Sequence, residues 1–203
     1  MRAGDIDVEL FETEARQLRA VRGAVFRAAY RVLGNRLGSG WIAAALARDP
    51  ALAQVVGPEV APRDWVPVDL LPSLLAGSAA AGRDPVKLAR EIGRVVAGGP
   101  FGRYDGEGID TAEQLFADSR RYWPRYASWG TLAATIGSGH ASIILGGGPR
   151  EIAVCGFVEG LLERLAELAG GVDAKAWHVR CRGRGDEQCL FELRWSPPRV
   201  LRQ

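Results

Sequence analysis

Residues 176–195, AWHVRCRGRGDEQCLFELRW, contain two runs rich in strand-forming residues on either side of a glycine-rich centre. Alternation of apolar and polar residues, clearest in the second run, is typical of a half-buried strand. Glycine together with aspartate favours a turn. The stretch therefore predicts two antiparallel strands, 176–182 and 188–195, that are joined by the turn Gly183–Asp186.

A second hairpin is predicted upstream of the first. Small and β-branched residues over 131–136 lead into Gly137-Ser-Gly139, and apolar residues follow at alternate positions over 141–145. The residues from 149 to 168 return to helical spacing, which ends at Gly170. Two hairpins with an intervening helix predict an antiparallel sheet on which one helix packs.

Helical spacing dominates the first two-thirds of the chain. Asp84 and Thr111 are predicted N-caps, and Gln114 completes a capping box with Thr111. The fold class is therefore α+β, with a helix-rich N-terminal two-thirds packed on a C-terminal antiparallel sheet. The predicted helices of the N-terminal part cover residues 8–33, 39–55, 69–81, 85–96 and 111–122.

The N-terminal helical segment 1–38 is treated as a unit because it holds the longest amphipathic helix. No neighbouring stretch of sequence obviously covers the apolar stripe of this helix, so we expect it to find a partner surface. A two-fold homodimer is the commonest solution, which makes this segment a candidate dimerisation element. Residues 39–203 form the second unit, with the remaining helices and the sheet.

Composition and charge exclude several classes of function. The 203 residues include 26 basic and 24 acidic side chains, and a net charge of +2 gives no general attraction to nucleic acid. The N-terminus lacks the apolar core of a signal peptide, and no stretch predicts a membrane span. Three cysteines, an odd number, disfavour a complete disulfide framework. We therefore expect a cytoplasmic protein.

All three cysteines and one of the two histidines lie between residue 155 and the C-terminus. Cys181 and Cys189 flank the turn of the terminal hairpin and are expected to lie about opposite one another. His178 precedes Cys181 by three residues, so strict alternation would separate them and a bulge is required. Cys155 lies in the first turn or two of the preceding helix. Together they predict a closed, structural zinc site. The alternative interpretation is a set of buried, reduced thiols.

Aromatic residues are concentrated between Phe101 and Trp129. Tyr122, Trp123, Tyr126 and Trp129 combine large apolar surfaces with hydroxyl or indole donors, as the walls of small-molecule pockets do. These four residues are the predicted lining of a ligand pocket. The alternative is that they fill the core.

Two stretches resemble the 4-vinyl reductase domain. They are Cys155-Gly-Phe-Val-Glu-Gly160 and the hairpin His178–Trp195, in which Cys181 and Cys189 enclose Gly185-Asp186. The same domain occurs in the sensory modules of phenol-responsive transcription activators, and its fold is similar to that of the vesicle-tethering TRAPP subunits. The resemblance implies a dimer, a ligand pocket between helices and sheet, and a zinc ion held by three cysteines and a fourth ligand, here His178.

The predicted function is a non-catalytic module that binds a small apolar or aromatic molecule and acts through a separate effector protein. No pair of titratable groups has the spacing of a catalytic site, and no nicotinamide or flavin fingerprint is present. An enzyme is therefore disfavoured. The alternatives are a TRAPP-like scaffold protein that works by protein–protein contacts and an accessory protein of a tetrapyrrole vinyl reductase.

Overall fold

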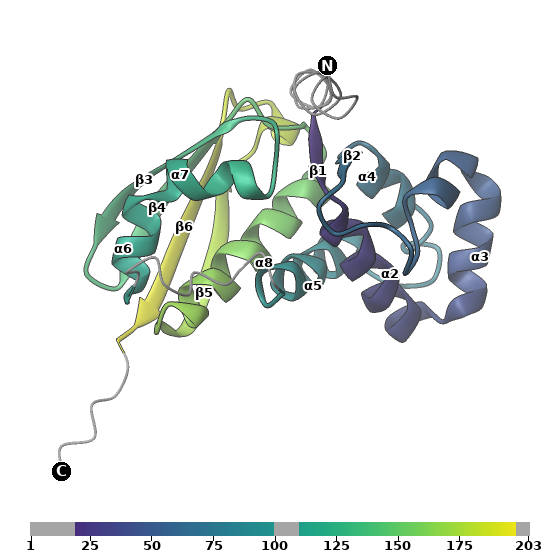
Figure 1. The fold of residues 1–203 in the computed structure, drawn as a ribbon. Coiled ribbons are helices and arrows are strands. Elements are labelled where there is room, and N and C mark those ends of the chain that lie inside the picture. The colour runs from purple at the N-terminus through teal and green to yellow at the C-terminus, as the bar shows by residue number, and fades with distance from the viewer. Residues whose placement is uncertain (1–18, 100–109, 198–203) are drawn as a thin grey trace, which may run out of the picture.

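The computed structural model describes residues 19–99 and 110–197 and confirms the α+β class (Figure 1). Its C-terminal part is a four-stranded antiparallel sheet in the order β3-β4-β6-β5. Helix α8 (Ile152–Leu168) connects the two hairpins and packs against the sheet, as predicted. The strands are β3 (Thr131–Gly137), β4 (His140–Gly146), β5 (Val172–Arg180) and β6 (Cys189–Ser196).

Strand β6 shows why the sheet has one buried and one solvated face. Cys189, Phe191, Leu193 and Trp195 are buried, whereas the residues between them are only partly buried or exposed. Successive side chains of a strand point to opposite faces, so this alternation places the four residues on the helix-covered side. Gly139 has a φ of +69° in the turn between β3 and β4, a conformation that glycine adopts without strain.

The helical part begins with a short strand where the sequence predicted one long helix. Residues 1–18 of the predicted dimerisation element lie outside the described residues. β1 (Ala20–Arg22) pairs with β2 (Trp65–Pro67), and α2 (Gly23–Leu37) starts only after it. The backbone N–H of Gly23 donates to the carbonyl oxygen of Asp64 at 2.7 Å, which ties this junction to the segment before β2. Long-range strand pairing thus overrides the local helical periodicity.

Two other predicted helices are divided in the structure, and a third is shorter than predicted. The helix predicted over 39–55 ends at Asp49, because Pro50 cannot continue the backbone hydrogen bonding of an α-helix. The helical elements of this part are α3 (Ser39–Arg48), η1 (Pro50–Gln54), α4 (Leu70–Leu75), α5 (Pro85–Ala97), α6 (Ala112–Ala117), α7 (Ser119–Tyr122) and η3 (Trp123–Arg125). The predicted caps are confirmed at α5 and α6, where Asp84 and the Thr111–Gln114 capping box accept the first free N–H groups.

Helices α5 and α8 cross at very short range in the middle of the molecule (Figure 1). A Cβ atom on Gly93 would lie 2.0 Å from the carbonyl oxygen of Phe157, and one on Gly160 would lie 1.9 Å from that of Arg90. Such distances are far below van der Waals contact, so only glycine permits this approach. The crossing holds the start of α8 in place relative to the helical part.

A network of ion pairs runs along the same crossing. Arg90 bonds to Glu159 at 3.1 Å and to Glu163, and Arg94 bonds to Glu163 and, at 2.8 Å, to Glu167. The Glu163 side chain is almost fully buried and also accepts the backbone N–H of Ala176 in β5. The hydrogen bond with Glu163 raises the pKa of Arg90, whereas burial raises the pKa of Glu159.

Helix α2 buries its apolar side within this chain. Val25, Phe26, Ala29 and Leu33 belong to the same core cluster as residues of α5 and α8. The apolar stripe that motivated the homodimer is therefore covered at least in this part, and the homodimer itself stays a prediction. Within the two described ranges, no helix is long and apolar enough to cross a membrane.

Candidate functional site

Four potential ligand side chains come together where α8 meets the terminal hairpin. The ligand atoms of Cys155, His178, Cys181 and Cys189 all lie within 4.8 Å of one another. The Sγ atom of Cys155 is 3.7 Å from that of Cys189 and 4.0 Å from that of Cys181. All three thiols are buried. The sequence-predicted residues thus form a single cluster.

A break in strand register makes this cluster possible. The pairing of β5 with β6 shifts between His178 and Arg180, a bulge of the kind that the sequence required. The chain leaves β5 before Cys181, whose backbone N–H donates to the Asp186 carboxylate at 2.7 Å. The last pair of β5 with β6 is Arg180 with Leu190, so Cys181 and Cys189 follow directly beyond it, about opposite one another, as predicted. The two cysteines thus meet at the end of the hairpin, where β5 gives way to the turn.

The environment of the cluster favours a thiolate. The hydrogen bond with the Cys155 thiol lowers the pKa of Cys189 to about 4, and the nearby His178 ring and the backbone N–H of Arg182 act in the same direction. The same Cys155–Cys189 hydrogen bond and burial raise the pKa of Cys155. One proton shared between neighbouring sulfur atoms explains the opposite directions.

His178 offers an unused donor atom to the cluster. Its ring stacks on Phe191 with a centroid distance of 4.6 Å, which fixes the ring plane. Its Nε2 atom is buried and has no hydrogen-bond partner among the described residues. A buried polar atom without a partner is costly, and a bound ion is one way to satisfy it. A tetrahedral ion with metal–sulfur bonds of about 2.3 Å separates its sulfur ligands by about 3.8 Å, close to the sulfur distances observed here.

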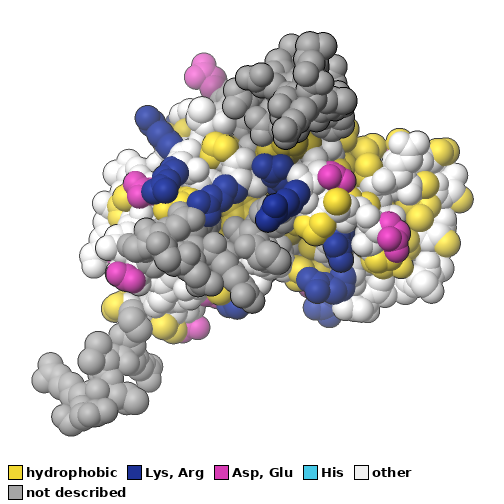
Figure 2. Space-filling view, in the orientation of Figure 1, with side chains coloured by type: hydrophobic (Ala, Val, Ile, Leu, Met, Phe, Trp, Pro, Cys, Tyr) yellow, Lys and Arg dark blue, Asp and Glu magenta, His cyan; other side chains and the backbone are white. Residues whose placement is uncertain are grey.

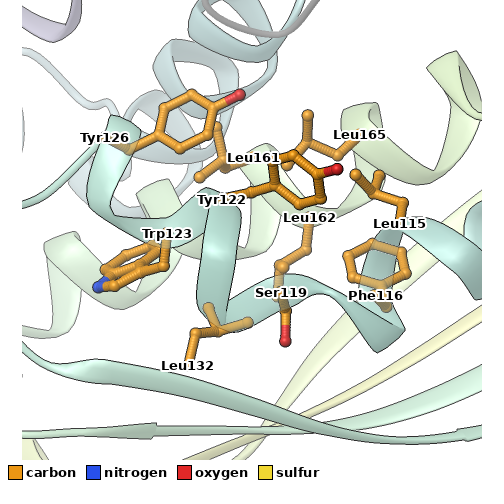
Figure 3. Close-up of a pocket in the computed structure, with 10 residues that line it drawn as sticks. All are labelled: Leu115, Phe116, Ser119, Tyr122, Trp123, Tyr126, Leu132, Leu161, Leu162 and Leu165. Carbon is orange, nitrogen blue, oxygen red and sulfur yellow. The ribbon is translucent and has the colours of Figure 1, made fainter. Parts of the chain in front are cut away.

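The predicted aromatic lining is divided in the structure. Tyr122, Trp123 and Tyr126 border a small pocket, together with residues of β3 and α8 (Figure 3). Trp129 is buried outside it, where its backbone carbonyl accepts the Trp123 indole N–H at 2.7 Å. The Trp129 ring lies edge-on to that of Trp123, with centroids 5.1 Å apart. Phe101, at the start of the aromatic segment, lies outside the described residues.

The pocket is small and nearly wholly apolar. Its open interior is about 20 Å³, which is room for about one water molecule. Leucines from α8 and β3 form most of the remaining wall, and they were not among the predicted lining residues. Their helical and strand periodicity predicted only burial. The lining residues besides the three aromatic ones are Leu115, Phe116, Ser119, Leu132, Leu161, Leu162 and Leu165.

Solved structures with this fold are H-NOX proteins, although no family model and no curated protein sequence matches the chain. A mutant H-NOX protein from S. oneidensis in the Fe(II) ligation state shares 15% identity, with a TM-score of 0.65, over 90% of this chain and 100% of that chain. The unliganded Fe(II) H-NOX protein from K. algicida shares 13% identity, with a TM-score of 0.65, over 89% and 100%. The S. oneidensis protein in the Fe(II)NO state shares 14%, with a TM-score of 0.61, over 86% and 99%.

These comparisons correct the resemblance drawn from sequence. The structural neighbours are H-NOX proteins and not 4-vinyl reductase domains or TRAPP subunits, so that identification is wrong. The zinc cofactor inferred with it is contradicted too, because the neighbours are iron proteins, some of them solved to study haem distortion and haem redox potential. The motifs on which the resemblance was based are short, and they define a local helix–hairpin geometry more than a whole fold.

The described residues do not fit a haem ligated by histidine or thiolate, two common ligands of haem iron. The chain has two histidines. His140 is exposed at the end of the β3–β4 turn, and His178 lies among the thiols. All three cysteines are in that cluster, where the buried thiols and the imidazole lie within 4.8 Å of one another, so a porphyrin ring cannot lie against any one of them without displacing the others. The chain therefore has the fold of the H-NOX proteins, with a thiol–imidazole cluster and a small apolar pocket of its own.

Proposed function

We propose that this protein is a non-catalytic module that binds a small apolar molecule and passes the change to a separate protein. The observation that carries the proposal is the apolar pocket between α6–η3, β3 and α8. A small space with an almost wholly apolar lining disfavours water and accepts an apolar guest instead. H-NOX proteins with this fold have been solved both unliganded and with NO, which supports ligand binding as a use of the fold.

The position of the pocket supports a role in signalling. Tyr122, Trp123 and Tyr126 lie on the short helices α7 and η3 or directly after them, and Leu162 faces them from α8 (Figure 3). A guest larger than the existing space has to displace one of these walls, because close-packed interiors have little spare volume. Arg120 and Arg121 are exposed on the outside of α7, where a second protein can detect that displacement.

The test uses benzene as the probe and measures the unfolding midpoint of three variants. Leu162→Phe fills the pocket, Leu162→Ala enlarges it, and Leu168→Phe is the matched control on the exposed part of α8. At about a hundredfold excess over its dissociation constant, a ligand stabilises by about 2.7 kcal/mol. We expect benzene to raise the midpoint of the wild type, the control and above all Leu162→Ala, but not that of Leu162→Phe. An unchanged midpoint in both the wild type and Leu162→Ala would contradict the proposal.

We further propose that Cys155, His178, Cys181 and Cys189 hold one thiophilic metal ion. The support is the closeness of the four donors, the burial of the three thiols and the unpartnered Nε2 atom of His178. Four protein ligands leave no open position, so the ion would fasten α8 to the terminal hairpin and would not activate water. Its binding energy would then add to the folding energy.

Cobalt(II) is the probe for this cluster, because tetrahedral thiolate coordination gives it intense visible and near-ultraviolet bands. The apoprotein should take up one equivalent and gain these bands. His178→Ala should weaken and alter them, whereas the control His140→Ala should leave them unchanged because His140 is exposed and remote from the thiols. Elemental analysis of protein purified without chelator identifies the native ion. Absence of the bands in the wild type, or identical bands in both variants, would refute the assignment.

A further inference from the structure

A groove on the helical part is separate from both sites described above. It lies between α2, the start of α3, the loop from Pro58 to Pro62 and the end of α5. Its volume is about 610 Å³, which is within the usual range of small-molecule sites. Figure 2 shows basic side chains next to apolar ones over this part of the molecule. The groove is thus large enough for a ligand of some ten to twenty heavy atoms, on the order expected of such sites.

The floor of this α2 groove is apolar. Ala28, Ile42 and Val96 contribute to it and are at most 5% exposed, while Pro58 and Pro62 form one wall. None of these side chains can donate or accept a hydrogen bond. The floor is therefore suited to a hydrocarbon chain or ring, because the transfer of apolar surface out of water is favourable.

The rim of the groove is cationic. Arg27 and Arg31 are one helical turn apart on α2, and both line the groove. The third arginine of α2, Arg36, is paired with Glu91 at 2.9 Å. Within residues 19–99 and 110–197, by contrast, neither Arg27 nor Arg31 has an ion-pair or hydrogen-bond partner. Helix α2 contains no acidic residue that could balance them.

This arrangement has an energetic consequence. Like charges at positions i and i+4 of a helix repel each other by a few tenths of a kcal/mol. A single anion between the two guanidinium groups removes the repulsion and forms charge-assisted hydrogen bonds, which arginine often makes in pairs to a carboxylate. Tyr30, which is 37% exposed, lies between the two arginines in the sequence and adds an amphipathic ring to the rim.

We propose that the α2 groove binds a small amphipathic carboxylate, such as a medium-chain fatty acid. The carboxylate lies between Arg27 and Arg31, and the apolar body lies along Ala28, Ile42 and Val96. Charge complementarity alone would select any anion, and the apolar floor alone would select any hydrocarbon. The two together select a molecule that has both parts, with the acid at one end.

The experiment measures binding of decanoate by calorimetry and compares it with two partial ligands. Decanol has the same chain without the charge, and acetate has the charge without the chain. We expect decanoate to bind at least tenfold more tightly than either, and its affinity to fall as the salt concentration rises. Equal binding of decanol and decanoate would overturn the proposal, because the arginines would then contribute nothing.

Two matched variants locate the site. The double variant Arg27→Gln/Arg31→Gln should lose at least tenfold in decanoate affinity, whereas Arg36→Gln, on the same helix but outside the groove, should retain it. Circular dichroism verifies that each variant is folded. Ile42→Phe narrows the floor of the groove without changing any charge, and it should also lower the affinity for decanoate. Unchanged affinity in the double variant would refute the site. Leu162→Phe should not affect decanoate binding, which keeps this outcome distinct from that of the apolar pocket.

Discussion

Replacing Gly160 by alanine should damage the α5–α8 crossing, although alanine is the better helix former. Gly160 lies in α8, between Cys155 at the thiol cluster and the pocket residues further along the same helix. Its missing side chain allows the carbonyl oxygen of Arg90 to lie 1.9 Å from the place where a Cβ atom would be. The substitution adds one methyl group where the backbones of the two helices are in close contact.

The expected magnitude follows from this distance. Ordinary van der Waals contact begins at 3.4 Å, so the helices would have to separate locally by about 1.5 Å. Overpacking of this kind typically costs about 1–3 kcal/mol, and the neighbouring ion pairs of Arg90 with Glu159 and Glu163 would be strained as well. The higher helix propensity of alanine relative to glycine offsets only about 0.5–1 kcal/mol of this cost. We therefore expect a net destabilisation of about 1–2 kcal/mol or more.

Chemical denaturation gives the free energy of unfolding, and Gly34→Ala in α2 is the matched control. A Cβ atom on Gly34 would meet nothing nearer than a side-chain carbon of Ile42 at 3.5 Å, which is ordinary contact. The control should therefore be neutral or more stable by up to about 1 kcal/mol. Thiol labelling in native conditions adds a second readout, because a displaced α8 carries Cys155 away from Cys181 and Cys189 and exposes the sulfur atoms.

A Gly160→Ala variant that is as stable as the wild type, with unchanged thiol labelling, would refute this role of the crossing. That result would mean that the helices separate at no cost and that their close approach is incidental. A change in stability equal to that of the control Gly34→Ala would have the same meaning. A loss confined to Gly160→Ala, with faster labelling, supports the crossing as the element that positions the cluster.

Substitutions at two further positions test the electrostatics and the capping. Burial raises the pKa of Glu167, but hydrogen bonds from Arg94 and Arg164 outweigh it, so the pKa is lower in the folded state. The charged Glu167 side chain therefore stabilises the fold above its unfolded pKa of about 4.3. This stabilisation is lost as the pH falls through the lower pKa of the folded state. Glu167→Gln should thus lower the free energy of unfolding by up to about 1 kcal/mol at pH 7. The difference between variant and wild type should vanish in acid, which thermal melts across a pH series would measure. A difference that does not depend on pH would contradict the electrostatic origin of the effect. Asp84→Ala should cost about 1 kcal/mol by removing the N-cap of α5, and Asp84→Asn should restore most of it; equal losses in both would argue against capping.

Local patterns predicted the terminal hairpins, α8 and the caps of α5 and α6, because these depend on residues that are close in sequence. The approach of Cys155, His178, Cys181 and Cys189 was predicted as well, including the need for a bulge. The four residues belong to one helix and one hairpin, and few arrangements of those two elements are available. Only the end of the strand differs: β5 ends at Arg180, because the turn stabilised by Asp186 replaces the last part of the predicted strand.

The sequence by itself determined the α+β class, the two hairpins and the inventory of thiol, imidazole and aromatic groups, because periodicity and turn chemistry act over a few residues. The tertiary structure alone decided that Ala20–Arg22 is a strand, that Trp129 is outside the pocket, and that Arg27 and Arg31 border a groove. It also showed the H-NOX fold where short motifs had indicated another. Each of these depends on contacts between segments far apart in the chain, and the balance of packing energies that selects such contacts is not expressed in any single stretch of sequence.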